Sequence, residues 1–491
     1  MTLMAAVDLG AQSGRVAVGE FDGERLTVEE VHRFENGPIE EDGVLRWDTD
    51  RLFEDAVAGV HVAAQNGPVA SVAADSWAVD FGLVDANGRL IRSPVHYRDT
   101  RRSDAVESVY SHIAPRELYE RTGIQLIPIN SIFELAAMAL EDDPALEDAE
   151  KLLMIPDLLH GRLCGSRSTE FTNATTTQCF DPRTQAWAHD LLERLHVPTR
   201  LLPDVVEPGT QLGTIDGGAL DGTTVIAVAT HDTGSAVAAV PFRQADSIFI
   251  SAGTWSLIGM EIGRPLITDE SYAANLTNEG GVSGTFRLLK NVTGLWLLHE
   301  SRRAWATAGL RHSFDDLVTL AEAAPPLRSL IDPDDESFAA PGEMPARIDE
   351  FCRRTGQPTP DDPGATSRCI LESIALKHAM TVDLLRGVTG TEPRELHMVG
   401  GGARNHLLCQ WTADATGMPV LAGPEEATVI GNLLVQAMAL GELGSLGEVR
   451  DVVRASFAPT VHEPSASAEW AVARERLAAL VSSGRALEVG S

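Results

Sequence analysis

Two stretches of the chain share one pattern: a short apolar strand, a tight turn of small residues, and a second apolar strand. The first is residues 5–14, AAVDLGAQSG, and the second is residues 248–256, IFISAGTWS. Gly, Ser, Thr and Ala let a backbone turn sharply and approach a ligand closely. Because similar units open two parts of a 491-residue chain, the pattern predicts a duplicated α/β architecture of two lobes with a cleft between them.

The composition changes near residues 241–246, which we take as the border between the lobes. We expect an N-terminal lobe over residues 1–243, a C-terminal lobe over residues 244–450, and a peripheral tail with a helix over residues 451–491.

Hydrophobic spacing predicts the main elements inside these lobes. Helical periodicity favours helices over residues 52–64, 151–163 and 365–388. A short apolar run over residues 223–229 is typical of a buried strand. It leads into the sequence His-Asp-Thr and then a helix of small residues.

The charge balance excludes several classes of partner. The chain has 39 Lys and Arg against 71 Asp and Glu, a net charge of −32, so its surface repels nucleic acid and anionic lipid. Its first residues do not read as a signal peptide, and it has no apolar run of ~18 residues that could span a membrane. The five cysteines match no zinc spacing. We therefore expect a cytoplasmic protein that works on small molecules, as a monomer or a dimer.

The first turn has the residue types of a phosphate site. Its glycines let backbone N–H groups reach a phosphate, and Asp8 at the strand end suits a magnesium ion held through water. It is neither a Walker loop nor GxGxxG, and taken alone it is more simply explained as an ordinary hairpin turn. Thr254 in the second turn has the same two interpretations.

The sequence His231-Asp232-Thr233 follows the buried strand and opens a helix. A carboxylate there can accept a proton from a sugar hydroxyl as the hydroxyl attacks phosphorus. The alternative is a helix N-cap, for which Asp and Thr are common. Three glycines at residues 400–402 also link a strand to a helix, which indicates a close backbone approach or a flat ligand such as a nucleoside.

Residues 75–80, DSWAVD, combine carboxylates with an indole, a pairing typical of sugar sites. The alternative is a half-buried strand with a core Trp77. Asn291 is a candidate ligand contact, whereas helix packing is the simpler explanation for Trp296.

The chain also resembles a known family, the FGGY carbohydrate kinases, over nearly all of residues 4–450. The runs that carry the resemblance are AVDLGAQSGR (6–15), HRFENGP (32–38), DSWAVDFGLVD (75–85), VHYRD (95–99), TNATTTQ (172–178), HDTGSAV (231–237), SAGTWSL (251–257), LTNEGG (276–281), LKNVTGLWLL (289–298) and VGGGARN (399–405). The family implies an actin-like, ribonuclease-H-like two-lobe fold, with ATP and sugar bound in the cleft. It also implies that the N-terminal lobe carries the sugar and a phosphate-binding turn, and that the C-terminal lobe carries the nucleotide. Within it, these runs are most similar to the branch that acts on L-rhamnulose.

The resemblance also implies roles for individual residues. Asp232 would take the proton from the C1 hydroxyl of L-rhamnulose, and Asp8 would support Mg²⁺. The sugar would lie near Asp75, Trp77, Ala78, His231, Thr233 and Asn291, and ATP near Ala11, Gln12, Ser13, Gly14, Arg15, Thr254, His299 and Gly401. The products would be L-rhamnulose 1-phosphate and ADP.

Three positions depart from the family pattern: Gln12 replaces Ser, Ala78 replaces Gly and His299 replaces Gln. They affect the substrate preference and one nucleotide contact rather than the class of reaction. The alternatives are a kinase for fuculose, ribulose, xylulose or glycerol, or a non-catalytic sensor of ATP and sugar. A chaperone-type ATPase would need a peptide-binding domain, which the sequence does not suggest.

Overall fold

The computed structural model describes residues 1–244, 246–465 and 467–488, and they form two compact units. Unit 1 comprises residues 1–241, 261–288 and 427–457; unit 2 comprises residues 242–260, 289–426 and the described residues from 458 onward. The lobe and tail boundaries expected from composition stay a prediction.

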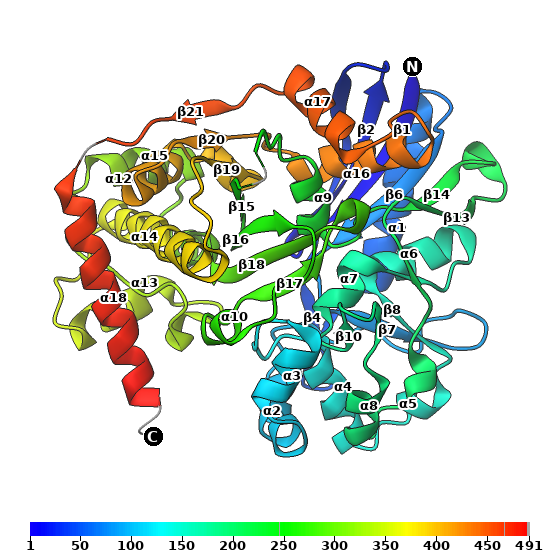
Figure 1. The fold of residues 1–491 in the computed structure, drawn as a ribbon, viewed down its shortest axis with the longest axis horizontal. Helices are drawn as coiled ribbons and strands as arrows, with labels where there is room; N and C mark the ends of the chain where they lie inside the picture. The colour runs from blue at the N-terminus through cyan, green and yellow to red at the C-terminus, as the bar shows by residue number, and fades with distance from the viewer. Residues whose placement is uncertain (245, 466, 489–491) are drawn as a thin grey trace. The chain divides into compact units, whose positions relative to one another are not determined.

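Unit 1 contains a six-stranded sheet (Figure 1). Its order is β13 (Thr210–Thr214), β14 (Thr224–Ala227), β6 (Ser71–Ser76), β1 (Thr2–Leu9), β2 (Ser13–Phe21) and β3 (Leu26–Glu35). The strand β1 pairs antiparallel with β2 and parallel with β6, and β6 pairs parallel with β14. The carboxyl ends of β1, β6 and β14 therefore meet at one edge of this sheet.

The second sheet repeats this arrangement. Its order is β17 (Thr277–Gly280), β18 (Phe286–Thr293), β16 (Trp255–Ile262), β15 (Ile248–Ala252), β19 (Leu396–Val399), β20 (Val420–Ala422) and β21 (Thr460–His462). The strand β15 pairs antiparallel with β16 and parallel with β19, and β19 pairs parallel with β20. The repeat predicted from sequence is thus present as a repeated sheet topology around β1 and β15.

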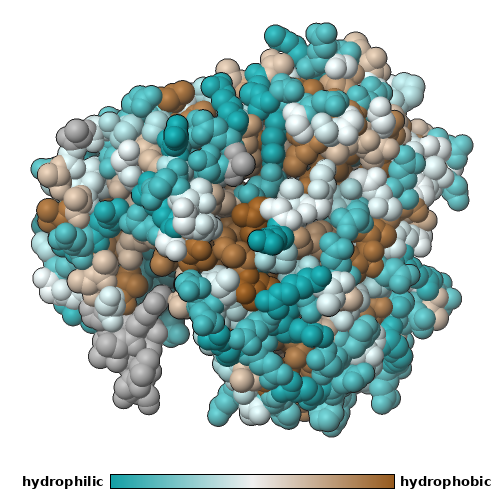
Figure 2. Space-filling model, in the orientation of Figure 1, coloured by the Kyte–Doolittle hydropathy of each residue, from teal (hydrophilic) through white to brown (hydrophobic). Residues whose placement is uncertain are grey.

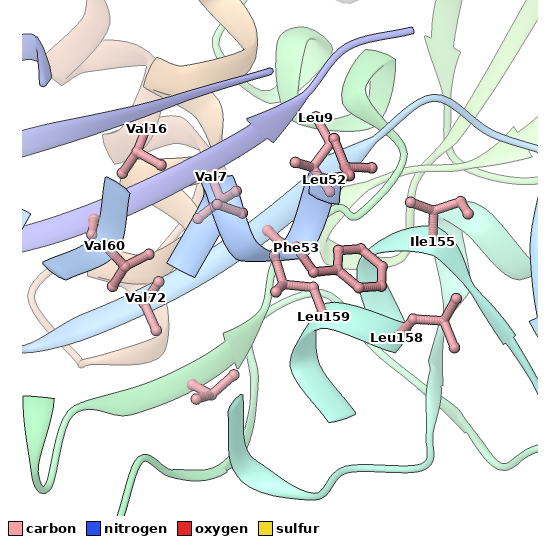
Figure 3. Close-up of a cluster of buried hydrophobic side chains, with 14 of the residues drawn as sticks. Val7, Leu9, Val16, Leu52, Phe53, Val60, Val72, Ile155, Leu158 and Leu159 are labelled. Atoms are coloured by element: carbon pink, nitrogen blue, oxygen red, sulfur yellow. The ribbon is translucent and has the colours of Figure 1, made fainter. Parts of the chain in front are cut away.

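Helices bury both faces of β1. Ala5, Val7 and Leu9 point to one face, where they join an apolar cluster with side chains of α1 (Thr49–Ala63) and α6 (Ile155–Cys164) (Figure 3). The opposite face carries Met4, Ala6 and Asp8 and is covered by α16 (Ala427–Ala439). A Cβ on Gly19, the register partner of Met4, would lie 2.6 Å from the side chain of Leu433 in α16.

Unit 2 is rich in long helices. The longest described there is α14 (Pro363–Thr389), which packs against α12 (Phe314–Ala323), α15 (His406–Thr416) and α18 (Ala468–Glu488). Asp362 caps α14 by accepting from the amide of Ala365, and Gly390 ends the helix with φ 67°. The helix predicted over residues 365–388 is confirmed.

The helix predicted over residues 151–163 is wrong in its first turn. Residues 151–154 form the strand β8 (Lys151–Met154), which pairs antiparallel with β7 (Phe81–Val84), and α6 begins only at Ile155. Pro156 occupies the start of α6, where its missing N–H costs nothing. An apolar run of this length fits both states, so the pairing with β7 decided the outcome.

The surface agrees with the composition. Figure 2 shows a face on which hydrophilic side chains predominate, as expected for a chain with 71 acidic residues. Among the described residues, no helix combines the length and the apolarity that crossing a membrane requires.

Candidate active site

Three of the predicted aspartates gather at the carboxyl edge of the unit 1 sheet. Asp8 and Asp75 are register partners near the ends of β1 and β6. Asp232 is the first residue of α9 (Asp232–Ala238), and the preceding segment is joined to β6 by the amide of Ser76, which donates to the carbonyl of Thr230 at 2.9 Å. The parallel pairing of β1, β6 and β14 is what brings together residues that are more than 200 positions apart.

These carboxylates affect one another. Burial raises the pKa of Asp75 well above its usual range, the neighbouring Asp8 raises it further, and a hydrogen bond from Asn432 opposes both. Burial also raises the pKa of Asp232, although 34 % of its side chain is exposed; His231 opposes the shift and Asp8 adds to it. A carboxyl whose pKa is raised is a better proton acceptor when ionised, which suits a general base.

The first turn is short. Strand β1 extends to Leu9, β2 begins at Ser13, and the amide of Gly10 donates to the carbonyl of Ser13 at 3.1 Å. A Cβ on Gly10 would lie 2.7 Å from that carbonyl, so the turn needs glycine. Residues 10–13 are half-buried and Gly14 is buried. Arg15 lies on β2 and forms an ion pair with Asp8 at 2.8 Å.

The neighbours of the Asp232 carboxylate approach one of its two oxygens, Oδ1. Its Oδ1 accepts from the Thr233 hydroxyl at 3.0 Å and lies 3.4 Å from Nε2 of His231. The N-cap of α9 is His231, whose side chain makes no capping hydrogen bond, so Asp232 is not the cap that the alternative interpretation required. The preceding Thr230 is fixed by its amide and hydroxyl, which both donate to Glu170.

Trp77 and Ala78 lie in the short loop between β6 and β7. The Trp77 ring is buried against Trp47, with ring centroids 4.0 Å apart. Both indole N–H groups donate to one oxygen of Asp80, at 2.9 and 2.6 Å. The loop therefore has a rigid aromatic backing, and the half-buried Ala78 follows it directly.

Four predicted residues lie in unit 2: Thr254, Asn291, His299 and Gly401. The Gly253-Thr254 turn is supported by the segment before α11 (Trp296–Thr307), because the amide of Gly294 donates to the carbonyl of Thr254 at 3.1 Å. A Cβ on Gly294 would lie 2.7 Å from the carbonyl oxygen of Gly253. This backbone packing fixes the turn that carries Thr254.

The three glycines at residues 400–402 have different constraints. A Cβ on Gly402 would lie 2.4 Å from Ala252, and Gly400 has φ 81°. A Cβ built on Gly401 would have no atom within 4 Å, so no packing contact requires glycine there. A flat ligand that packs against this backbone would explain the glycine.

Asn291 and His299 lie on either side of Gly294 in the sequence. Asn291 is half-buried on β18, and His299 lies on α11 with its ring 4.9 Å from Phe314. Burial lowers the pKa of His299 to about 4, with Arg302 adding to the effect. His299 is therefore neutral near pH 7, as the amide it replaces would be.

Three site residues were missed by the sequence analysis. Asn432 of α16 donates to Asp75 at 2.5 Å and accepts from Gln436 at 2.7 Å. Glu279 and Arg287 approach His231 from β17 and β18. The available signals were polar residues at positions i and i+4 of an apolar helix, and a charge inside an apolar strand, because buried polar groups need partners.

Comparison with known proteins decides the family. The model of the N-terminal domain of the FGGY family of carbohydrate kinases matches residues 3–239, and the model of its C-terminal domain matches residues 248–440. The chain belongs to the FGGY family of carbohydrate kinases. ATP is the phosphoryl donor of this family, so the predicted carbohydrate kinase with ATP as substrate is confirmed.

Two relatives named rhamnulokinase cover almost the whole chain. That of Bacteroides thetaiotaomicron is 43 % identical over 471 residues, 95 % of this chain and 96 % of the relative. That of Pectobacterium carotovorum is 40 % identical over 483 residues, 97 % of this chain and 96 % of the relative.

Solved structures of FGGY kinases share the fold. A xylulose kinase from Lactobacillus acidophilus aligns with a TM-score of 0.79 at 17 % identity, covering 100 % of this chain and 98 % of its own. A glycerol kinase from Plasmodium falciparum aligns with a TM-score of 0.76 at 15 % identity, covering 99 % and 98 %. The predicted α/β class and the two-domain actin-like, ribonuclease-H-like fold are confirmed.

Proposed function

We propose that this FGGY kinase transfers the γ-phosphoryl group of ATP to the C1 hydroxyl of L-rhamnulose, giving L-rhamnulose 1-phosphate and ADP. The choice of L-rhamnulose is supported by the two relatives named rhamnulokinase, whose similarity extends over nearly the full length of this chain and of each relative. A cytoplasmic location agrees with this role and stays a prediction.

The observation that carries the mechanism is the geometry of Asp232. Thr233 and His231 both approach its Oδ1, and about a third of the side chain is open to solvent. The other oxygen is therefore available for a substrate hydroxyl. In the transfer, the C1–O–H proton passes to Asp232, the C1 oxygen bonds to the γ-phosphorus, and the bond from phosphorus to the β–γ bridging oxygen breaks to release ADP.

Backbone donors supply much of the phosphate binding in this proposal. The backbone N–H groups of the first turn belong to Ala11, Gln12, Ser13 and Gly14, and that of the second belongs to Thr254. Gly401 accepts the flat nucleoside where no side chain blocks it. Because the chain has a net charge of −32, such local donors must outweigh its overall field.

Asp8 fits Mg²⁺. Among the described residues no group of three or more His, Cys, Asp and Glu forms a metal cluster, but Mg²⁺ commonly takes one or two carboxylates, waters and phosphate oxygens. Asp8 is 12 % exposed at its side chain, and Oδ1 of its register partner Asp75 is buried without a hydrogen-bond partner in the described structure. Asp8 would hold the ion through water, and the bound ion would neutralise charge on the transferred phosphoryl group.

In unit 1, Thr233, His231 and the Trp77-Ala78 loop would contact the sugar, and the role expected for Asn291 of unit 2 stays a prediction. Trp77 is held by Asp80, so its position is fixed before the sugar binds. Ala78 adds a methyl group where the family pattern has Gly, which narrows the space beside the sugar.

The test is a coupled ADP-release assay with Mg-ATP against L-rhamnulose, L-fuculose, L-ribulose, D-xylulose and glycerol. We expect preference for L-rhamnulose, and a fall in kcat of ~10²–10⁴ in Asp232→Asn with unchanged folding. Preference for another sugar would leave the proposed mechanism intact and show that the substrate is that sugar instead of L-rhamnulose. No sugar-dependent ADP release from a folded, ATP-binding protein would favour the non-catalytic sensor instead.

A further inference from the structure

An ionic group lies buried directly behind the proposed base. Glu279 on β17 is 4 % exposed, Arg287 on β18 is 0 % exposed, and both belong to unit 1 with His231. Nη1 of Arg287 lies 3.3 Å from Oε2 of Glu279. Burying an arginine and a glutamate is costly unless each is well paired, so the contacts of this pair indicate why it is there.

Both members of the pair contact one nitrogen of His231. Nη2 of Arg287 lies 3.1 Å from Nδ1, and Oε2 of Glu279 lies 3.2 Å from the same atom. A guanidinium has only donors, so beside Arg287 the neutral ring accepts at Nδ1 and carries its proton on Nε2. If the ring is instead doubly protonated, Glu279 is the anion beside Nδ1–H, and Nε2 again carries a proton. In both states Nε2 is protonated and lies 3.4 Å from Oδ1 of Asp232.

This arrangement decides which oxygen of Asp232 meets the sugar. The Thr233 hydroxyl donates to Oδ1 at 3.0 Å, and the protonated Nε2 of His231 lies 3.4 Å from the same oxygen. Both groups favour the orientation of the carboxylate in which this oxygen faces them, which leaves the other oxygen for the sugar hydroxyl.

We propose that Glu279 and Arg287 are positioning residues for phosphoryl transfer: they hold His231 with its Nε2 proton on Asp232, which leaves the second Asp232 oxygen for the sugar hydroxyl. The inference rests on the proposed function, since it concerns the base of that reaction. It predicts that the pair acts mainly on kcat, because it controls the orientation of the base.

A merely structural role must be separated from this one. Nε of Arg287 also donates to the carbonyl of Gly280 at 2.8 Å, so the arginine supports the end of β17 as well. Arg287→Lys keeps a buried cation but loses the planar set of donors that reaches Gly280, Glu279 and His231 together. Glu279→Gln keeps the shape and removes the charge.

The experiment is a double-mutant cycle in the full-length protein. Glu279→Gln and Arg287→Lys are each made alone and with Asp232→Asn, and kcat and both KM values are measured with L-rhamnulose and Mg-ATP. Alone, each should lower kcat by ~10- to 100-fold and leave the KM for ATP within ~2-fold. With Asp232→Asn, the same changes should cost less than ~2-fold, because there is no longer a base to orient.

Glu372→Gln and Arg368→Lys are the matched controls. They alter an ion pair of α14 in unit 2, in which Nε of the half-buried Arg368 donates to the buried Glu372 at 2.8 Å, and should leave kcat within ~2-fold. Thermal unfolding of every variant shows whether it folds; if Arg287→Lys does not, Glu279→Gln alone decides.

The outcomes are distinguishable. An undiminished fall in kcat on the Asp232→Asn background, or full kcat in folded Glu279→Gln, would overturn the positioning role while leaving the kinase intact. If the unaltered protein releases no sugar-dependent ADP, the proposed function fails and the positioning role fails with it.

Discussion

The turns after β1 and β15 follow the same backbone pattern but differ in the charge of the side chains beside them. In the shared pattern Asp8 corresponds to Ser251, and the register partner of Asp8 is Asp75, whereas that of Ser251 is Val399. The first turn is thus preceded by one carboxylate with a second beside it on β6 and Asp232 at the same sheet edge, whereas the corresponding positions before the second turn are uncharged. One backbone unit thus occurs with two kinds of surroundings: under the proposed function, the charge in unit 1 would serve proton and metal chemistry, and the tightly packed backbone in unit 2 would serve the nucleotide.

Exchanging the residue that distinguishes the two turns tests this most strongly. Asp8→Ser gives the first turn the residue of the second, and we expect kcat to fall by ~10²–10³ because charge on the phosphoryl group is no longer balanced. Steady-state kinetics with Mg²⁺ titration measures it. Ser251→Ala is the control and should keep kcat within ~3-fold; equal losses in both variants would mean that the turns do not differ as described.

The packing of the second turn is tested by Gly294→Ala. The new Cβ would meet backbone atoms of Gly253 and Trp255 at 2.7 Å, which cannot move as a side chain could. We expect a loss of about 1–3 kcal/mol in the free energy of unfolding and a raised KM for ATP.

Chemical denaturation and ATP titration check this prediction. Gly387→Ala in α14, where nothing lies within 4 Å, is the control and should be neutral or stabilising by up to ~1 kcal/mol. Normal stability and ATP affinity in Gly294→Ala would show that the second turn does not depend on this contact.

Gly401→Ala separates binding from stability. Because nothing lies within 4 Å of the new methyl group, the free energy of unfolding should stay unchanged, while the KM for ATP rises by ~10-fold if a nucleoside packs there. Gly402→Ala is the contrast, since its Cβ would lie 2.4 Å from Ala252 and should destabilise unit 2. An unchanged KM in Gly401→Ala would remove this residue from the nucleotide site.

The smallest effect is expected at His299. With a pKa of about 4, His299 is neutral above pH ~5.5, so His299→Gln should leave kcat at pH 7 within ~2-fold. Its folded pKa lies below the ordinary 6.5, so the unfolded chain binds more protons between these values and stability falls as pH drops from 6.5 to 4. His299→Gln should flatten that fall in thermal unfolding; an identical slope would contradict the buried, neutral ring.

The sequence by itself determined the class of fold, the repeated strand–turn–strand units and the family. It also singled out Asp8 and Asp232, because strand ends, turns and small-residue helices are local patterns that near neighbours in the chain specify. Where a local pattern allowed two states, as over residues 151–163, pairing with β7 chose between them.

Only the tertiary structure decided the surroundings of the aspartates. Asn432 reaches Asp75 from 357 positions away, and Arg287 reaches His231 from 56 positions away. Those partners are set by which helix covers β1 and which strands lie behind α9, and no local pattern contains that information. The physical reason is that a buried charge takes its chemistry from whatever packing places around it.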